Sequence, residues 1–188
     1  MNARQSLRVL ALLPLLCGCL SRQAPLEIRD LVAPLEPLEL RDTPGLRELA
    51  FPGVQDRADL RRGLLWRTTE TELVVDELNR WTRSPAELLD ERLRDLLFAA
   101  GGYRSSLRPG VPALEVQLVR CDADLRGAAP VAVVELVLAF DAPAAQHRHR
   151  LRVQEPMERA SADEQAEAVG RALSRAAAQV ESWVRARQ

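Results

Sequence analysis

The chain has 188 residues, of which 47% are hydrophobic and 4% aromatic, enough for one domain of ordinary size with its own core. Its formal net charge of −1 argues against a nucleic-acid partner, because phosphate binding needs a concentrated basic face.

The chain begins with the layout of a secretory signal peptide. Arg4 and Arg8 supply a cationic start, and a nearly unbroken apolar run follows over residues 9–16. That run is about half of the ~20 residues that span a hydrocarbon core, so we expect a cleaved signal over residues 1–18 and no permanent transmembrane helix.

The end of this signal resembles the lipobox of bacterial lipoproteins, with Leu16 at position −3, Gly18 at −1 and Cys19 at +1. The resemblance implies cleavage between Gly18 and Cys19, a diacylglyceryl group on the Cys19 thiol, and an N-acyl chain such as palmitate on the new amino group. Cys17 fits less well, because a bulky Leu would precede the cut. Leu20 is not the Asp associated with inner-membrane retention, which favours the periplasmic face of the outer membrane. An ordinary secretory signal with two incidental cysteines is the alternative.

The mature chain is expected to open with a lipidated tether over residues 19–25 and a first strand over residues 26–31. Irregular chain should follow up to Arg62, because four prolines interrupt it: Pro34, Pro37, Pro44 and Pro52. Residues 63–72 mix apolar and β-branched side chains, which indicates another strand.

The strongest helix signal follows Trp81. Ser84 is placed as N-cap, Pro85 as the first helical residue and Glu87 three residues after the cap, and leucines at helical spacing continue to the glycines at 101–102.

The next fifty or so residues are typical of a β-meander. Alternation predicts a half-buried strand over residues 114–121, and continuous apolarity predicts a central strand, covered on both faces, over residues 131–140. Residues 147–153 alternate strictly and indicate an edge strand with its arginines facing water.

A second capping box at Ser161 and Glu164 should open a long amphipathic helix that closes on the sheet. The predicted fold class is therefore α+β: an antiparallel or mixed β-sheet packed against two main α-helices, in a single domain over residues 26–188.

Catalytic patterns are missing from the sequence: it has no phosphate loop, GxSxG elbow, HExxH or paired metal-binding cysteines. Cys121 remains single after lipidation of Cys19, and we interpret it as a buried strand residue rather than a nucleophile. His147 and His149 share one strand face and could seat a metal only with further ligands. We therefore expect no enzyme activity, no metal and no cofactor, apart from the covalent acyl chains on Cys19.

A series of short motifs resembles the ABC-type transport auxiliary lipoprotein family, which includes the lipoprotein of the paraquat-inducible Pqi system and serves MCE-type lipid transport. The resemblance covers roughly residues 26–187. In chain order, the motifs are Trp66-Arg67, Thr71-Glu72-Leu73, Asn79-Arg80-Trp81, Ser84-Pro85-Ala86-Glu87-Leu88-Leu89, Arg92-Leu93, Leu114–Leu118 and Val131–Phe140.

The resemblance implies a non-catalytic periplasmic accessory of an ABC/MCE lipid transporter, with an MCE-domain protein and an ABC permease as partners. Phospholipid binding and a homo-oligomer would also fit the family. On this interpretation Trp66, Arg80 and Trp81 are candidates for partner contact, and the alternative places both tryptophans in the core. Two other classes stay open: a lipoprotein that regulates or assembles another envelope machine, such as a cell-wall synthase activator, and an envelope enzyme or metal protein that uses His147 and His149.

Overall fold

The computed structural model describes residues 27–38, 47–58, 62–99 and 102–187. The predicted signal peptide over residues 1–18, its cleavage site between Gly18 and Cys19, and the tether over residues 19–25 lie outside the described residues.

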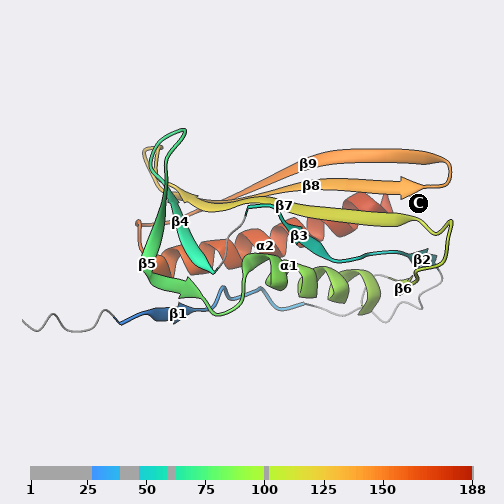
Figure 1. Cartoon of the computed structure of the whole chain (residues 1–188), viewed down its shortest axis with the longest axis horizontal. Coiled ribbons are helices and arrows are strands. Elements are labelled where there is room, and N and C mark those ends of the chain that lie inside the picture. Colours follow the sequence, from blue (N-terminus) through green and yellow to red (C-terminus); the bar gives the residue numbers. More distant parts are fainter. Residues whose placement is uncertain (1–26, 39–46, 59–61, 100–101, 188) are drawn as a thin grey trace, which may run out of the picture.

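The main sheet is mixed and seven-stranded, as predicted for the fold class (Figure 1). The strand order is β1 (Arg29–Leu31), β5 (Leu73–Trp81), β4 (Gly63–Arg67), β7 (Ala113–Asp124), β8 (Val131–Ala142) and β9 (Ala145–Pro156), with β3 (Val54–Asp56) beside β7. β7 and β8 pair antiparallel, as do β8 and β9, while β4 joins the end of β7 in parallel. β3 pairs in parallel with the same edge of β7, nearer the start of that strand.

The helices are α1 (Pro85–Arg94), which continues into the π-helix η1 (Asp95–Ala99), and α2 (Ala162–Arg185). In Figure 1, α1 and α2 lie on the same side of β7, β8 and β9. Ser84 and Glu87 form the full capping box predicted for α1. At α2 the Ser161 hydroxyl accepts the Glu164 N–H, but the Ser161 N–H bonds to a backbone carbonyl, so only half of the second box is present. No helix in the described ranges is long and apolar enough to cross a membrane.

The core lies between the helices and the inner face of the sheet. Alternate residues of β7 and β8, such as Val116 and Leu138, are fully buried on that face, because a strand with one covered face buries every second side chain. The largest of the buried side chains are Trp81, Phe140, Leu49, Leu64, Leu89, Leu93, Leu97, Leu114, Leu118, Leu136, Leu138 and Leu173.

Two sequence predictions about the sheet were wrong. The segment before Arg62 is not wholly irregular, since it contains β3 and also β2 (Arg47–Leu49), which pairs in parallel with β6 (Tyr103–Ser105). The prolines prevent long elements there, but three residues suffice when a distant strand supplies the hydrogen bonds. β8 is not covered on both faces along its whole length: both helices lie on one side, and on the other side Val133 is buried but Val137 is only half-buried.

Cys121 is 3% exposed on the core face of β7, in agreement with its interpretation as a buried strand residue. Burial, with smaller contributions from the negative charges of Asp122 and Asp56, raises the pKa of its thiol. Because only the thiolate reacts, we expect Cys121 to resist a disulfide-exchange reagent such as Ellman's reagent in the folded protein and to react fully after unfolding in urea. Rapid labelling under native conditions would contradict this placement.

Candidate partner-contact surface

The β4–β5 arm, formed by β4, β5 and the turn at residues 68–72, carries all three residues predicted to contact a partner. In Figure 1 it stands at the opposite end of the sheet from the β8–β9 turn. Trp81 is 2% exposed and belongs to the core, which is the alternative that the sequence left open for it. Trp66 is half-buried, and its Nε1 donates to Asp76 Oδ2 at 3.4 Å.

Arg80 is the exposed member of the three. Its Nε donates to Asp30 Oδ1 at 2.5 Å, which ties β5 to β1. The same hydrogen bond holds the pKa of Asp30 below its usual range. Both side chains are about half exposed, at 53% each, so the pair stays in solvent and contributes little to stability.

An exposed apolar patch on β5 was not predicted. Leu73, Val74, Val75 and Leu78 are 44%, 44%, 56% and 41% exposed, although they belong to a strand of the main sheet. Leu73, Val74 and Val75 are consecutive and lie on both faces of one strand, and exposed aliphatic side chains grouped in this way indicate an interaction surface. These residues, called the β5 patch below, form the strongest candidate for partner contact in the described part of the chain.

A bulge in β5 separates the patch from the core end of the strand. The register with β4 passes from Gly63 opposite Arg80 to Leu65 opposite Val75, so β5 has extra residues between these pairs. Asp76 stabilises the bulge, because its Oδ1 accepts the N–H groups of Leu78 and Asn79, both at 2.9 Å. Partial burial opposes ionisation of Asp76, but the hydrogen bonds it accepts outweigh burial and lower its pKa.

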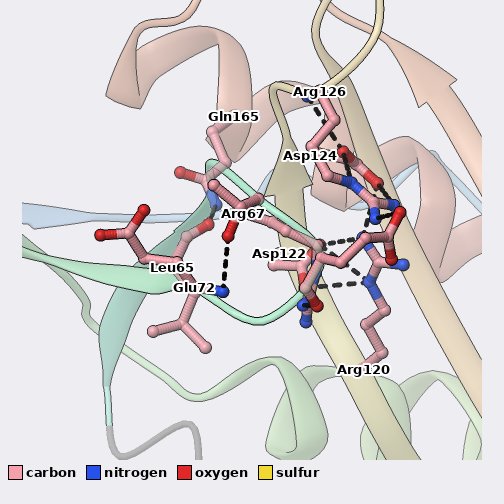
Figure 2. Close-up of polar contacts among 10 residues, drawn as sticks. Leu65, Arg67, Glu72, Arg120, Asp122, Asp124, Arg126 and Gln165 are labelled. Carbon is pink, nitrogen blue, oxygen red and sulfur yellow. Dashed lines mark hydrogen bonds and ion pairs between the residues drawn. The ribbon is translucent and has the colours of Figure 1, made fainter.

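An ionic cluster fastens the arm to β7 (Figure 2). Asp122 Oδ2 accepts from Nε and Nη2 of Arg67, both at 3.1 Å, and its carboxylate also accepts from Arg120 Nε at 2.9 Å. Arg120 Nη2 continues to Asp124 Oδ2 at 2.9 Å, and Arg126 Nη2 reaches the same oxygen at 2.7 Å. Asp122 and Asp124 are 1% and 6% exposed, so these ion pairs are shielded from solvent.

Further contacts fix the arm at its tip and on its other side. Arg126 also forms an ion pair with Glu70 in the turn of the arm. On the helix side, Gln165 Nε2 donates to the Leu65 carbonyl of β4 at 3.0 Å (Figure 2). The arm is therefore held in place while the β5 patch stays exposed.

The ionic cluster should make the stability of the fold depend on pH. Hydrogen bonding from Arg126, helped by Arg120 and opposed by partial burial, holds the pKa of Asp124 well below its usual range. A lowered folded-state pKa stabilises the fold above the unfolded pKa, and that contribution disappears as the pH falls. We expect the free energy of unfolding to drop between about pH 5 and pH 2, and Asp124→Asn to drop less over that range. Equal slopes for both proteins in urea titrations would exclude Asp124 as the cause.

His147 and His149 lie on the helix-facing side of β9. The His149 ring stacks on Trp183 of α2 at 5.8 Å between centroids, and the Arg187 guanidinium lies 4.2 Å from the Trp183 ring centroid. Trp183 itself is only partly buried, so it packs against the core rather than within it. No group of three or more His, Cys, Asp or Glu side chains suited to a metal occurs in the described part of the chain.

Taken together, the fold and this surface define a single-domain α+β protein that presents an apolar strand on a fastened arm. The family model described as ABC-type transport auxiliary lipoprotein component matches residues 50–181. The chain therefore belongs to this family, as its motifs predicted, and the family description is that of an auxiliary component of transport.

Solved structures show the same fold. A Xanthomonas campestris protein of the DUF330 family superposes with a TM-score of 0.66 at 18% identity, covering 84% of this chain and 94% of that one. A second crystal structure, of an uncharacterized protein, gives a TM-score of 0.63 at 14% identity and covers 84% of this chain and 99% of the other. Among curated proteins, none matches the chain.

Proposed function

We propose that this chain is a non-catalytic accessory of an ABC/MCE-type lipid transport system between the inner and outer membranes. Acyl chains on Cys19 would hold it at the periplasmic face of the outer membrane. The observation that carries the proposal is the family match over residues 50–181, together with an exposed apolar surface on a fastened arm. Such a surface suits docking rather than chemistry.

The partners in this proposal are an MCE-domain protein that crosses the periplasm and the ABC permease complex beneath it. In this proposal Arg80 and Trp66 would take part in the contact, since they lie on the same arm as the β5 patch. Trp81 would act only by supporting the arm from the core. Phospholipid binding and a homo-oligomer belong to the same proposal.

Affinity purification of the full acylated chain from its native membranes, in mild detergent, tests this function. Mass spectrometry should recover an MCE-domain protein or an ABC permease, and an Arg80→Ala variant should recover less of it. Recovery of a peptidoglycan synthase or an outer-membrane assembly factor instead would move the protein to another envelope machine and overturn the proposal.

The anchor has its own test. Cys19→Ser should give an uncleaved or soluble periplasmic form, because a hydroxyl cannot form the thioether. Fractionation followed by intact mass measurement checks this, with Cys17→Ser as the matched control that should stay lipidated. A Cys19→Ser protein that still carries the acyl mass would refute lipidation at this residue.

A further inference from the structure

We infer that the free edge of β5 at Leu73–Val75 accepts an extended segment of a partner protein, with alternating basic and aliphatic side chains, as an added strand. The inference rests on the proposed function, because it names the chemistry of the contact made by the β4–β5 arm. Three observations carry it: the backbone groups at this edge, the exposure of both faces of the strand, and the charge of the arm.

Backbone N–H and C=O groups at this edge are oriented to form hydrogen bonds with an added strand. β1 pairs with β5 only at Asn79–Trp81, and no described strand lies on that side of Leu73–Val75. On the β4 side, the Thr68 N–H donates to the Glu72 carbonyl at 3.3 Å. Since bonded and non-bonded pairs alternate along an antiparallel ladder, Leu73 and Val75 direct their N–H and C=O groups away from β4, towards the free edge.

Both faces of the strand are exposed here. Leu73 and Val75 share one face at 44% and 56% exposure, and Val74 lies on the other face at 44%. A bilayer surface would cover one face and would leave the backbone groups without partners in hydrocarbon. An added strand bonds these groups and covers aliphatic side chains on both faces, so the geometry favours an extended peptide over lipid.

The acidic residues around this edge favour a partner segment with basic side chains. Between Thr68 and Asn79 the sequence has four acidic residues and no basic one: Glu70, which is already paired with Arg126, and Glu72, Asp76 and Glu77. Opposite charges across a strand pair are favourable and like charges are unfavourable. A segment in which Arg or Lys alternates with Val, Ile or Leu therefore complements this edge in both charge and apolar character.

The same charges argue against two other occupants. Antiparallel pairing of β5 with a second copy, centred on or just after Val74, would place Glu72 opposite Asp76 or Glu77. The other occupant is the chain's own segment before β1. Extending the register of β1 backwards along β5 would bring Glu27 opposite Glu77, which places like charges together. It would also bring Pro25, which has no N–H, opposite Val75, so this segment is a poor partner for the edge.

The test uses the full-length chain in detergent and two fluorescent peptides, one of alternating Arg and Val and one of alternating Glu and Val. Fluorescence anisotropy should show the Arg/Val peptide binding at least about tenfold more tightly. Val75→Pro removes an N–H that faces away from β4, so it should weaken binding about tenfold while the arm stays folded. Val75→Thr keeps the N–H and the β-branched shape, and it should bind like the wild type.

A second variant guards against misfolding of Val75→Pro. Glu72→Arg combined with Glu77→Arg leaves the backbone unchanged and should transfer the preference to the Glu/Val peptide. Binding that is unaffected by both variants would overturn the inference. Self-association in sedimentation experiments that Val75→Pro abolishes would also overturn it, because the edge would then belong to a second copy.

The outcomes for the two proposals are separable. If native membranes yield no transporter component but the wild-type chain binds the Arg/Val peptide in the predicted manner, the proposed function fails and the strand-acceptor edge stands. If transporter components are recovered equally with wild type and Val75→Pro, and the peptide does not discriminate, only the edge inference fails.

Discussion

Replacing Asp122 with alanine is expected to lower the free energy of unfolding by about 3 kcal/mol, because it leaves buried positive charges without their partner. Arg67 and Arg120 both donate to this carboxylate, and their side chains are only 17% and 14% exposed. Water therefore cannot fully replace Asp122. Urea unfolding should show a lower midpoint with an unchanged slope.

The matched control is Asp30→Asn, which removes a carboxylate from a solvent-exposed pair with Arg80. Solvent screens such a pair, so its unfolding midpoint should not move measurably. Equal losses for Asp122→Ala and Asp30→Asn would mean that shielding from solvent does not strengthen the cluster. Amide hydrogen exchange should also accelerate across the β4–β5 arm in Asp122→Ala, because Arg67 ties the arm to β7.

Local signals predicted the helices and the long strands of this fold. The start of α1 is determined by adjacent residues, since Ser84 and Glu87 satisfy each other's backbone groups. Alternation and apolar runs likewise located β7, β8 and β9, each of which is long enough for its pattern to stand out. The β8 face away from the helices is covered only in part, near Val133, because an apolar run reports composition and does not show on which side the helices lie.

The candidate site was less accessible to sequence reasoning. Leu73, Val74 and Val75 are all apolar, and both faces of β5 are exposed at these residues. Apolar and polar residues therefore do not alternate here, and the period-two signal of a half-buried strand is missing. The ionic cluster joins Arg67 to Asp122, 55 residues later, across strands that are not consecutive in the chain. Only the register between β4 and β7 brings these charges together, and no local pattern encodes that register. For Trp81, the sequence could offer only two alternatives, and burial of the side chain decided for the core.

Gly170→Ala is expected to lower the free energy of unfolding by about 2 kcal/mol, although alanine is the better helix former by about 1 kcal/mol. A Cβ at position 170 would lie 2.1 Å from the carbonyl oxygen of Pro34, which is backbone and cannot turn aside. One turn later, Ser174 Oγ accepts the Glu36 N–H at 3.0 Å and donates to the Gly170 carbonyl at the same distance. The segment after β1 is thus seated directly on α2.

Whether Gly170→Ala lowers or raises the free energy of unfolding shows whether close packing or helix propensity dominates at this position. If the Pro34 segment is held against α2, Gly170→Ala must displace it, and β1 should lose protection in hydrogen exchange along with the loss of global stability. Gln179→Ala, at an exposed position of the same helix, gains propensity without a clash and should not destabilise the protein. A stabilised Gly170→Ala variant would show that α2 does not hold this segment. β1 would then be held by its three residue pairs with β5 and by the exposed ion pair between Arg29 and Asp163 at the start of α2.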